Sequence, residues 1–317
     1  MKTKSAFALV ILTHLTFVTF TTSAHPGSGI VVDSRGWVYF NEAGDPDARL
    51  PGSIWQIDPQ GKLTRLKVGG AHYLALDTKG GLASDDLARW FSARVTPWFQ
   101  QVDTADAQLI QADGQPLASH RDGSLYFAKR NVEIVRLTPD GKQTAISPAL
   151  EAAVMKLGGI KGLAFGPEDN LYASCPSAII KVKPDGTFST VIHPIALPNC
   201  DEEVPQGTPK EHSPFLRGLA VDAHGTVFAA ATGCRAVVKI SPDGKVSIVM
   251  RAEAPWSPTG VAVHGDDVYV LEYEHPNSPQ KVDWVPRVRK LAGDGKVTTL
   301  ATLPTAQNRP VTPERKP

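Results

Sequence analysis

Ionisable side chains occur at two recurrent places in this sequence: directly before one kind of short apolar segment, and directly after another. Lys161 and Arg217, for example, each precede a Gly-Leu-Ala segment. Cations of this kind donate charge-assisted hydrogen bonds to carboxylates and phosphates, so together they would favour an anionic ligand. The recurrent positions hold His72, Lys129, Lys161 and Arg217 as bases, and Glu42, Asp86 and Glu272 as acids.

These positions belong to a unit that repeats along the chain. Each unit opens with a small residue and a buried strand, and continues through a polar turn into a second strand. Apolar or alternating runs of about five residues are typical of short β-strands rather than helices. The first strands are clearest at 162–165, 218–221 and 260–263, the second at 170–173, 226–229 and 267–270, and the third at 179–182 and 237–240.

Tight turns separate the third strand of a unit from the fourth. Proline presets φ, aspartate caps its own turn, and glycine takes the positive φ that a tight hairpin needs. The turns are Pro139-Asp140-Gly141, Pro184-Asp185-Gly186 and Pro242-Asp243-Gly244, with Pro59-Gln60-Gly61 and Gly293-Asp294-Gly295 as variants.

The repeat predicts the fold. First strands start near Gly29, Tyr73, Pro116, Gly162, Gly218 and Gly260, at intervals of 42 to 56 residues. Four-stranded propeller blades run about 40 to 50 residues, and the longest interval contains an insertion at 196–215. We therefore predict an all-β, six-bladed β-propeller of four-stranded blades over residues 25–304. In the second unit, residues 82–111 lack a Pro-Asp-Gly turn, and its outer strands stay undefined.

In such a propeller the recurrent positions converge on the central channel. The residue before each first strand is Ser28, His72, Gln115, Lys161, Arg217 or Thr259, and the residue after each second strand is Glu42, Asp86, Lys129, Cys175, Ala231 or Glu272. Converging charges add their fields and shift pKa values. The competing interpretation is a solvated face of ordinary charged turns. The predicted ligand-binding residues are Glu42, His72, Lys129, Lys161, Arg217 and Glu272.

The repeat resembles that of known propeller families. The pattern G-[ILV]-[AV]-x-D-x-x-G-x-[VL]-[YF], with Pro-Asp-Gly-Lys downstream, is similar to NHL-repeat propellers and to the gluconolactonase/SMP-30 superfamily. The resemblance covers the chain from residue 25 to about 304. It implies the fold rather than an activity, because propellers carry many unrelated functions.

The resemblance also implies an enzymatic alternative. Metal-dependent lactonases of that superfamily hold a divalent cation with acidic and asparagine side chains, but here Lys161, Arg217 and Thr259 occupy the asparagine position. Cations there disfavour a calcium site, since calcium needs oxygen ligands, although Glu42 and Glu272 could supply carboxylates. In streptogramin lyases a histidine and a glutamate surround Mg²⁺, and His72 and Glu272 resemble that pair. We predict no cofactor, with a divalent cation as the alternative.

Three cysteines cannot all pair within one chain, so at least one has no partner. Cys200 lies in the insertion that leads into the fifth unit, and Cys234 lies in the turn after the second strand of that unit. We predict a Cys200–Cys234 bridge, which would stabilise the loop by roughly 3 kcal/mol, and a free Cys175. The alternative is that all three are unpaired.

The N-terminus has the features of an export signal. Lys2 and Lys4 precede an uncharged, mostly apolar run at 6–20, and the small residues at 22–24 suit signal peptidase. We expect cleavage after residue 24, a secreted or periplasmic protein, and a polar tail at 305–317.

The 33 basic and 32 acidic residues give no excess charge for nucleic acid, and no later segment is apolar enough to insert in a membrane. We expect a monomer that binds a small molecule or a partner segment, with a lactone hydrolase or lyase as the alternative function.

Overall fold

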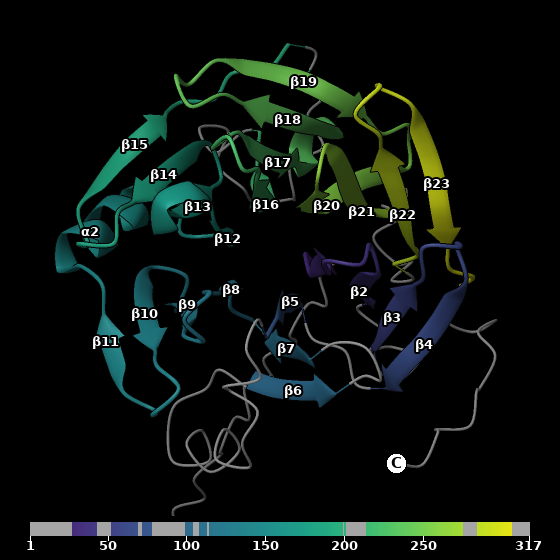
Figure 1. The fold of residues 1–317 in the computed structure, drawn as a ribbon. Coiled ribbons are helices and arrows are strands. Elements are labelled where there is room, and N and C mark those ends of the chain that lie inside the picture. Colours follow the sequence, from purple (N-terminus) through teal and green to yellow (C-terminus); the bar gives the residue numbers. More distant parts are fainter. Residues whose placement is uncertain are drawn as a thin grey trace, which may run out of the picture.

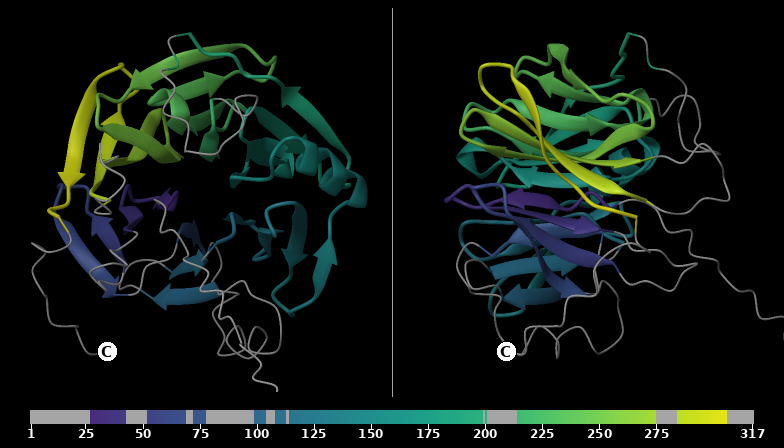
Figure 2. Two further views of the ribbon diagram at one scale, coloured as in Figure 1. Left: turned by 180° about the vertical axis from the view of Figure 1, so that it is seen from behind. Right: turned by 90° about the vertical axis from the view of Figure 1, so that its right-hand side faces the viewer.

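A computed structural model describes residues 27–42, 52–68, 72–77, 99–103, 108–112, 114–198, 200, 214–274 and 284–305. Sheets arranged around a central axis form a β-propeller, seen face-on in Figure 1 and from behind and from the side in Figure 2. Five of the sheets are four-stranded blades, which we name A to E in chain order. In each, consecutive strands pair antiparallel from the axis outward.

The strands of the five blades have the following bounds. Blade A contains β1 (Ile30–Val32), β2 (Val38–Glu42), β3 (Ser53–Ile57) and β4 (Leu63–Val68). Blade B contains β8 (Leu117–Ser119), β9 (Leu125–Lys129), β10 (Glu133–Leu137) and β11 (Gln143–Ala145). Blade C contains β12 (Gly162–Phe165), β13 (Leu171–Cys175), β14 (Ala178–Val182) and β15 (Phe188–Ile192). Blade D contains β16 (Leu216–Val221), β17 (Val227–Ala231), β18 (Ala236–Ile240) and β19 (Val246–Arg251). Blade E contains β20 (Trp256–His264), β21 (Asp267–Glu274), β22 (Pro286–Leu291) and β23 (Val297–Thr302).

The prediction of six four-stranded blades is wrong in its count. Between blades A and B lies a three-stranded sheet of β5 (Tyr73–Leu76), β6 (Phe99–Asp103) and β7 (Gln108–Ala112), in the order β5-β7-β6. Its inner strand β5 packs against both β1 and β8. The chain therefore passes from the inner strand to the outer one and returns to the middle. This part of the sequence lacks the Pro-Asp-Gly hairpin that orders the third and fourth strands elsewhere.

The hairpin turns form as the sequence predicts. Gly61, Gly141, Gly186, Gly244 and Gly295 all have φ between 83° and 85°. Each donates its backbone N–H to the carbonyl three residues earlier, at 2.8–2.9 Å. Glycine is needed here because side chains rarely adopt this left-handed backbone conformation.

The hydrophobic core lies between neighbouring sheets. Blades C and D share one cluster, in which Tyr172 and Ile179 of blade C pack against residues of blade D such as Leu219 and Ala229. A helix the sequence analysis did not predict, α2 (Pro148–Lys156), buries Leu150 and Val154 between blades B and C. No helix in the described part of the chain is long and apolar enough to cross a membrane.

The ring closes without exchanging a strand between its first and last blades. The inner strands β20 and β1 pack side by side. Thr259 Oγ1 donates to the Gly27 carbonyl at 2.7 Å, and the Tyr273 hydroxyl donates to the Asn41 carbonyl at 2.7 Å. Buried hydrogen bonds across the junction therefore join blade E to blade A.

Candidate functional site

Glycines bring the inner strands unusually close at the end of the ring where those strands begin. A Cβ on Gly162 would lie 2.8 Å from the Arg217 carbonyl, and one on Gly218 would lie 2.9 Å from the Gly260 Cα. Only glycine allows backbones to approach this closely. The residues just before these glycines, Lys161 and Arg217, are therefore held on adjacent strands. We call this end of the ring, formed by Ser28, Tyr73, Lys161, Arg217 and Thr259, the mouth.

Lys161 is positioned by two elements. Its backbone N–H donates to the Ser174 carbonyl of β13 at 2.8 Å, while the preceding residue, Ile160, donates to the Asn131 carbonyl at 2.6 Å. The half-buried Lys161 ammonium lies 5.8 Å from the centre of the Phe215 ring, which is cation–π distance. Within the described residues, no carboxylate forms an ion pair with Lys161.

Arg217 lies beside Lys161 on the neighbouring blade. Its carbonyl accepts a 2.5 Å hydrogen bond from Ser174 Oγ, which ties β16 to β13. Burial lowers the pKa of Arg217, while the Tyr73 and Tyr273 hydroxyls act in the opposite direction. Burial likewise lowers the pKa of Lys161, and the charge of Arg217 lowers it further. The mouth thus holds two neighbouring cations that are partly removed from water, which disfavours both charges.

Cys175 ends β13 near Lys161 and is fully buried. Burial raises the pKa of this thiol to about 12, although Lys161 opposes the shift. The thiol is therefore neutral at physiological pH and supplies no negative charge to Lys161. Its burial and high pKa are those of a packing residue rather than a reactive nucleophile.

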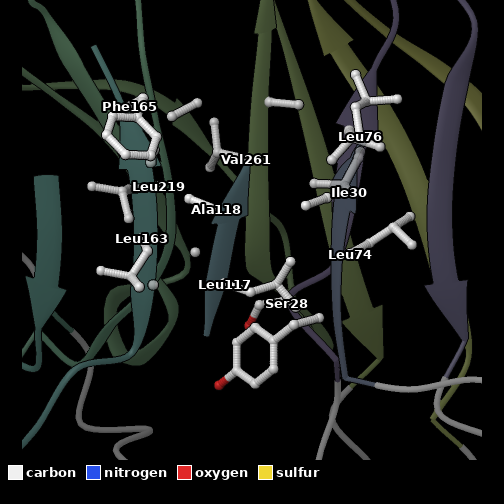
Figure 3. A pocket seen from close by; sticks show the side chains of 18 of the residues that line it. Ser28, Ile30, Leu74, Leu76, Leu117, Ala118, Leu163, Phe165, Leu219 and Val261 are labelled. Atoms are coloured by element: carbon white, nitrogen blue, oxygen red, sulfur yellow. The ribbon is translucent and has the colours of Figure 1, made fainter. Parts of the chain in front are cut away.

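A channel of about 260 Å³ begins at the mouth and follows the propeller axis. Residues from β1, β5, β8, β12, β16 and β20 line it, and Figure 3 shows aliphatic side chains such as Ile30, Leu163 and Leu219 along its wall. Two polar side chains, Ser28 and Tyr73, line the end next to Arg217. The Ser28 hydroxyl is buried and has no hydrogen-bond partner among the described residues.

Glu272, a candidate for catalysis and for a metal, is held by arginines. The carboxylate is fully buried; one oxygen pairs with Arg287 Nε, and the other pairs with an Arg289 guanidinium nitrogen at 2.5 Å. The Arg287 guanidinium in turn stacks 4.2 Å from the Trp256 ring centre. Both carboxylate oxygens therefore already pair with arginine, and the two positive charges beside them disfavour a metal ion there.

The other acidic and basic candidates are not gathered around one atom. Glu42 is fully buried and accepts a 3.0 Å hydrogen bond from Trp55 Nε1. Lys129 pairs with Glu133 at 3.3 Å, on the hairpin that joins β9 to β10. The His72 carbonyl accepts hydrogen bonds from the N–H groups of residues 28 and 29, while its side chain is half-buried. Asp86 lies outside the described residues. No cluster of three potential metal-ligating histidine, cysteine, aspartate or glutamate side chains occurs in the described parts of the chain.

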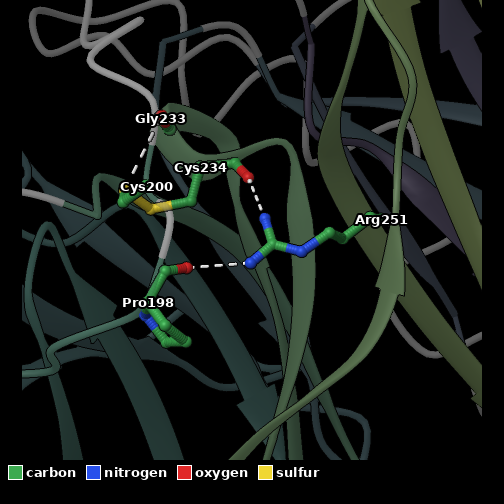
Figure 4. The surroundings of a disulfide bond; sticks show 5 residues. All are labelled: Pro198, Cys200, Gly233, Cys234 and Arg251. Atoms are coloured by element: carbon green, nitrogen blue, oxygen red, sulfur yellow. Dashed lines mark hydrogen bonds between the residues drawn. A yellow bond between two sulfur atoms is a disulfide. The ribbon is translucent and has the colours of Figure 1, made fainter.

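The predicted disulfide is confirmed. Cys200 and Cys234 are bridged across 34 residues with a Cα–Cα distance of 4.4 Å, and Cys175 is free and buried. Arg251 forms hydrogen bonds on both sides of the disulfide (Figure 4). Its guanidinium donates to the Pro198 carbonyl at 2.8 Å and to the Cys234 carbonyl at 3.4 Å. The start of the insertion is thereby fixed to blade D.

The sequence analysis missed three residues at the mouth or directly beside it. Phe215 provides the ring beneath Lys161, Tyr73 interacts with Arg217, and the Ser28 hydroxyl, although its position was noted, was not assigned a role. Each lies within two residues of a recurrent position. Scanning the neighbours of those positions for aromatic side chains would have found Phe215 and Tyr73.

No protein-family model matches the chain, and no curated protein matches it. Solved structures do match. Virginiamycin B lyase from Staphylococcus aureus is 14% identical over 88% of this chain and 85% of its own, with a TM-score of 0.45. The calcium-binding protein regucalcin from Agrobacterium tumefaciens is 14% identical over 80% and 84%, with a TM-score of 0.47. A putative gluconolactonase is 14% identical over 88% and 78%, with a TM-score of 0.43. Similarity at this level carries no inference about activity. The fold and the site define this chain as a β-propeller with a cationic mouth and an apolar axial channel.

Proposed function

We propose that this protein binds a small ligand whose anionic group lies between Lys161 and Arg217 at the mouth. The observation that carries the proposal is that Lys161 and Arg217, both partly buried, stand on adjacent inner strands whose backbones approach closely. Burial lowers the pKa of each. Burial of the Lys161 charge is unfavourable, and no carboxylate among the described residues pairs with it, so a bound anion would relieve that cost. Each charge-assisted hydrogen bond to the ligand would contribute about 1.5 to 3 kcal/mol.

The contacts that the acidic residues make fit a ligand-binding role better than the enzymatic alternative. A lactone hydrolase or lyase would use Glu42, His72 and Glu272 together. Glu272 is instead held by two arginines and Glu42 by Trp55. A ligand-binding role requires neither carboxylate to change partner.

We propose further that the protein is exported and acts as a monomer outside the cytoplasm. The basic start, the apolar run and the small residues at 22–24 support removal of residues 1–24, and the Cys200–Cys234 bridge suits an oxidising compartment. We also propose that the three-stranded sheet is a sixth blade, since β5 packs between the inner strands of two blades, and that the repeat of the other blades is of the NHL type.

Calorimetric titration with acetate and with inorganic phosphate tests the binding role. The comparison pairs Lys161→Met with Lys142→Met, which removes an exposed cation from a hairpin turn. Lys161→Met should weaken anion binding about tenfold or more, and Lys142→Met should change it less than twofold. Removal of a partly buried cation should also leave the unfolding temperature unchanged or raised. The proposal is overturned if the wild type binds neither anion, or if both variants bind like the wild type.

A further inference from the structure

The cationic pair lies directly before two of the strands that line the apolar channel. Gly162 and Gly218 line the channel, and the residues immediately before them are Lys161 and Arg217. Tyr73 lines the channel at its mouth end and is near enough to Arg217 to affect the pKa of the guanidinium. A ligand bound between the cations therefore has an apolar passage directly beneath its anionic group.

The walls of that passage are suited to a hydrocarbon. Beyond the mouth, the side chains that line it are mainly aliphatic: Figure 3 shows Leu74, Leu163, Leu219 and Val261 around the same space. Apolar cavities favour apolar occupants, since filling them removes hydrocarbon surface from water. At the mouth end the Ser28 hydroxyl, which has no hydrogen-bond partner among the described residues, can donate to an oxygen of the ligand.

We propose that the ligand is a medium-chain alkyl carboxylate, with its carboxylate at Lys161 and Arg217 and its alkyl chain along the propeller axis. The inference rests on the proposed function, and adds the chemical class of the ligand. The volume of the channel limits the length of the alkyl chain. A dry cavity of about 150 Å³ accommodates the six carbons of benzene. At the same volume per carbon atom, the 260 Å³ channel accommodates about ten carbon atoms.

The test is a calorimetric series of acetate, butyrate, hexanoate, octanoate, decanoate and dodecanoate below their micelle concentrations. Each methylene that enters the channel is worth about 0.8 kcal/mol, so affinity should rise up to fourfold per carbon. The rise should stop at about ten carbons, where the channel is full. Straight-chain alcohols of the same lengths should bind at least tenfold more weakly, because they lack the charge that the cations recognise.

A channel-filling variant tests the position of the chain. Ala118 points into the channel in Figure 3, and Ala118→Leu should shorten the longest favourable ligand by about three carbons while leaving acetate binding unchanged. Ala145→Leu, the same change at an exposed position on β11, should alter neither. If Ala118→Leu does not fold, the wild-type series still decides the question.

The possible outcomes separate the two claims. Acetate binding that depends on Lys161 but does not strengthen with chain length overturns the alkyl-chain inference and leaves the proposed function in place. Alcohols that bind as tightly as carboxylates, with the same dependence on length, overturn the anionic head group. Failure of every carboxylate to bind, with phosphate still bound, overturns the alkyl carboxylate alone, and failure of phosphate as well overturns both claims.

Discussion

Replacing Glu272 by glutamine should strongly destabilise the fold, because the carboxylate is fully buried between two arginines. Arg287 and Arg289 are only 15% and 13% exposed, and Arg289 also donates to the Arg251 carbonyl at 3.1 Å. Glutamine keeps the size of the side chain but removes the charge that balances both guanidinium groups. The change therefore leaves two poorly solvated cations facing a neutral amide.

The expected loss is about 3 to 5 kcal/mol of unfolding free energy, the range found when one partner of a buried ion pair is removed. Glu133→Gln is the matched control. Its pair with Lys129 is partly exposed to solvent, with side-chain accessibilities of 30% and 34%, and pairs near the surface contribute about 1 kcal/mol or less. Replacing glutamate by glutamine should therefore lower the unfolding free energy much more at position 272 than at position 133.

Urea denaturation, followed by tryptophan fluorescence and circular dichroism, measures both variants on one scale. Acetate titration of each folded variant completes the assay. A loss below about 1 kcal/mol for Glu272→Gln would refute the structural role assigned to the carboxylate. If binding were lost while stability was kept, Glu272 would belong to the ligand site instead.

The remaining predictions concern the free thiol, the pH dependence of binding and the packing of the inner strands. Cys175, with its pKa raised to about 12 by burial, should resist a thiol reagent in the folded protein and be the one thiol labelled after unfolding without reductant. Burial lowers the pKa of Lys161, so carboxylate affinity in titrations should fall as the pH rises through that lowered value. Below it Lys161 is charged and binding persists. Gly260→Ala should cost about 3 kcal/mol or more in denaturation, because its Cβ would collide with the Ser28 carbonyl. Gly295→Ala, with open space around it and φ of 85°, should cost only about 1 to 2 kcal/mol.

Each of these has a clear contrary result. Rapid labelling of the native thiol would mean that Cys175 is accessible. An affinity that stays constant until the ordinary lysine range near 10.5 would mean that burial does not affect Lys161. Equal losses for the two glycine variants would mean that close approach of the inner strands is not what requires glycine at position 260.

The sequence predicts the regular part of the fold because its signals are local. A Pro-Asp-Gly turn specifies a hairpin through the conformations of its own residues, and every such turn forms as expected. Inner strands begin within four residues of their predicted starts. The three-stranded sheet shows the limit. Where no turn motif orders the strands, pairing depends on contacts distant in sequence, and the β5-β7-β6 order could not be anticipated.

The site was predictable only in part, for a similar reason. Aligning the repeats identifies Lys161 and Arg217 because they occupy equivalent positions on successive units. It assigns Glu272 to the same set, but the partner of that carboxylate comes from β22, where Arg287 pairs directly opposite it. Alignment of equivalent positions gives no information about such cross-strand partners. Phe215 was missed because it has no equivalent in other units.

The most direct test of the central claim is a crystal structure of the protein, without residues 1–24, grown with octanoate. We expect density for the carboxylate at the mouth, with an oxygen about 2.7 to 2.9 Å from Lys161 Nζ and another within hydrogen-bond distance of the Arg217 guanidinium. The alkyl chain should continue into the axial channel past Leu163. Density for octanoate elsewhere on the molecule, or an unchanged mouth at saturating octanoate, would contradict the account.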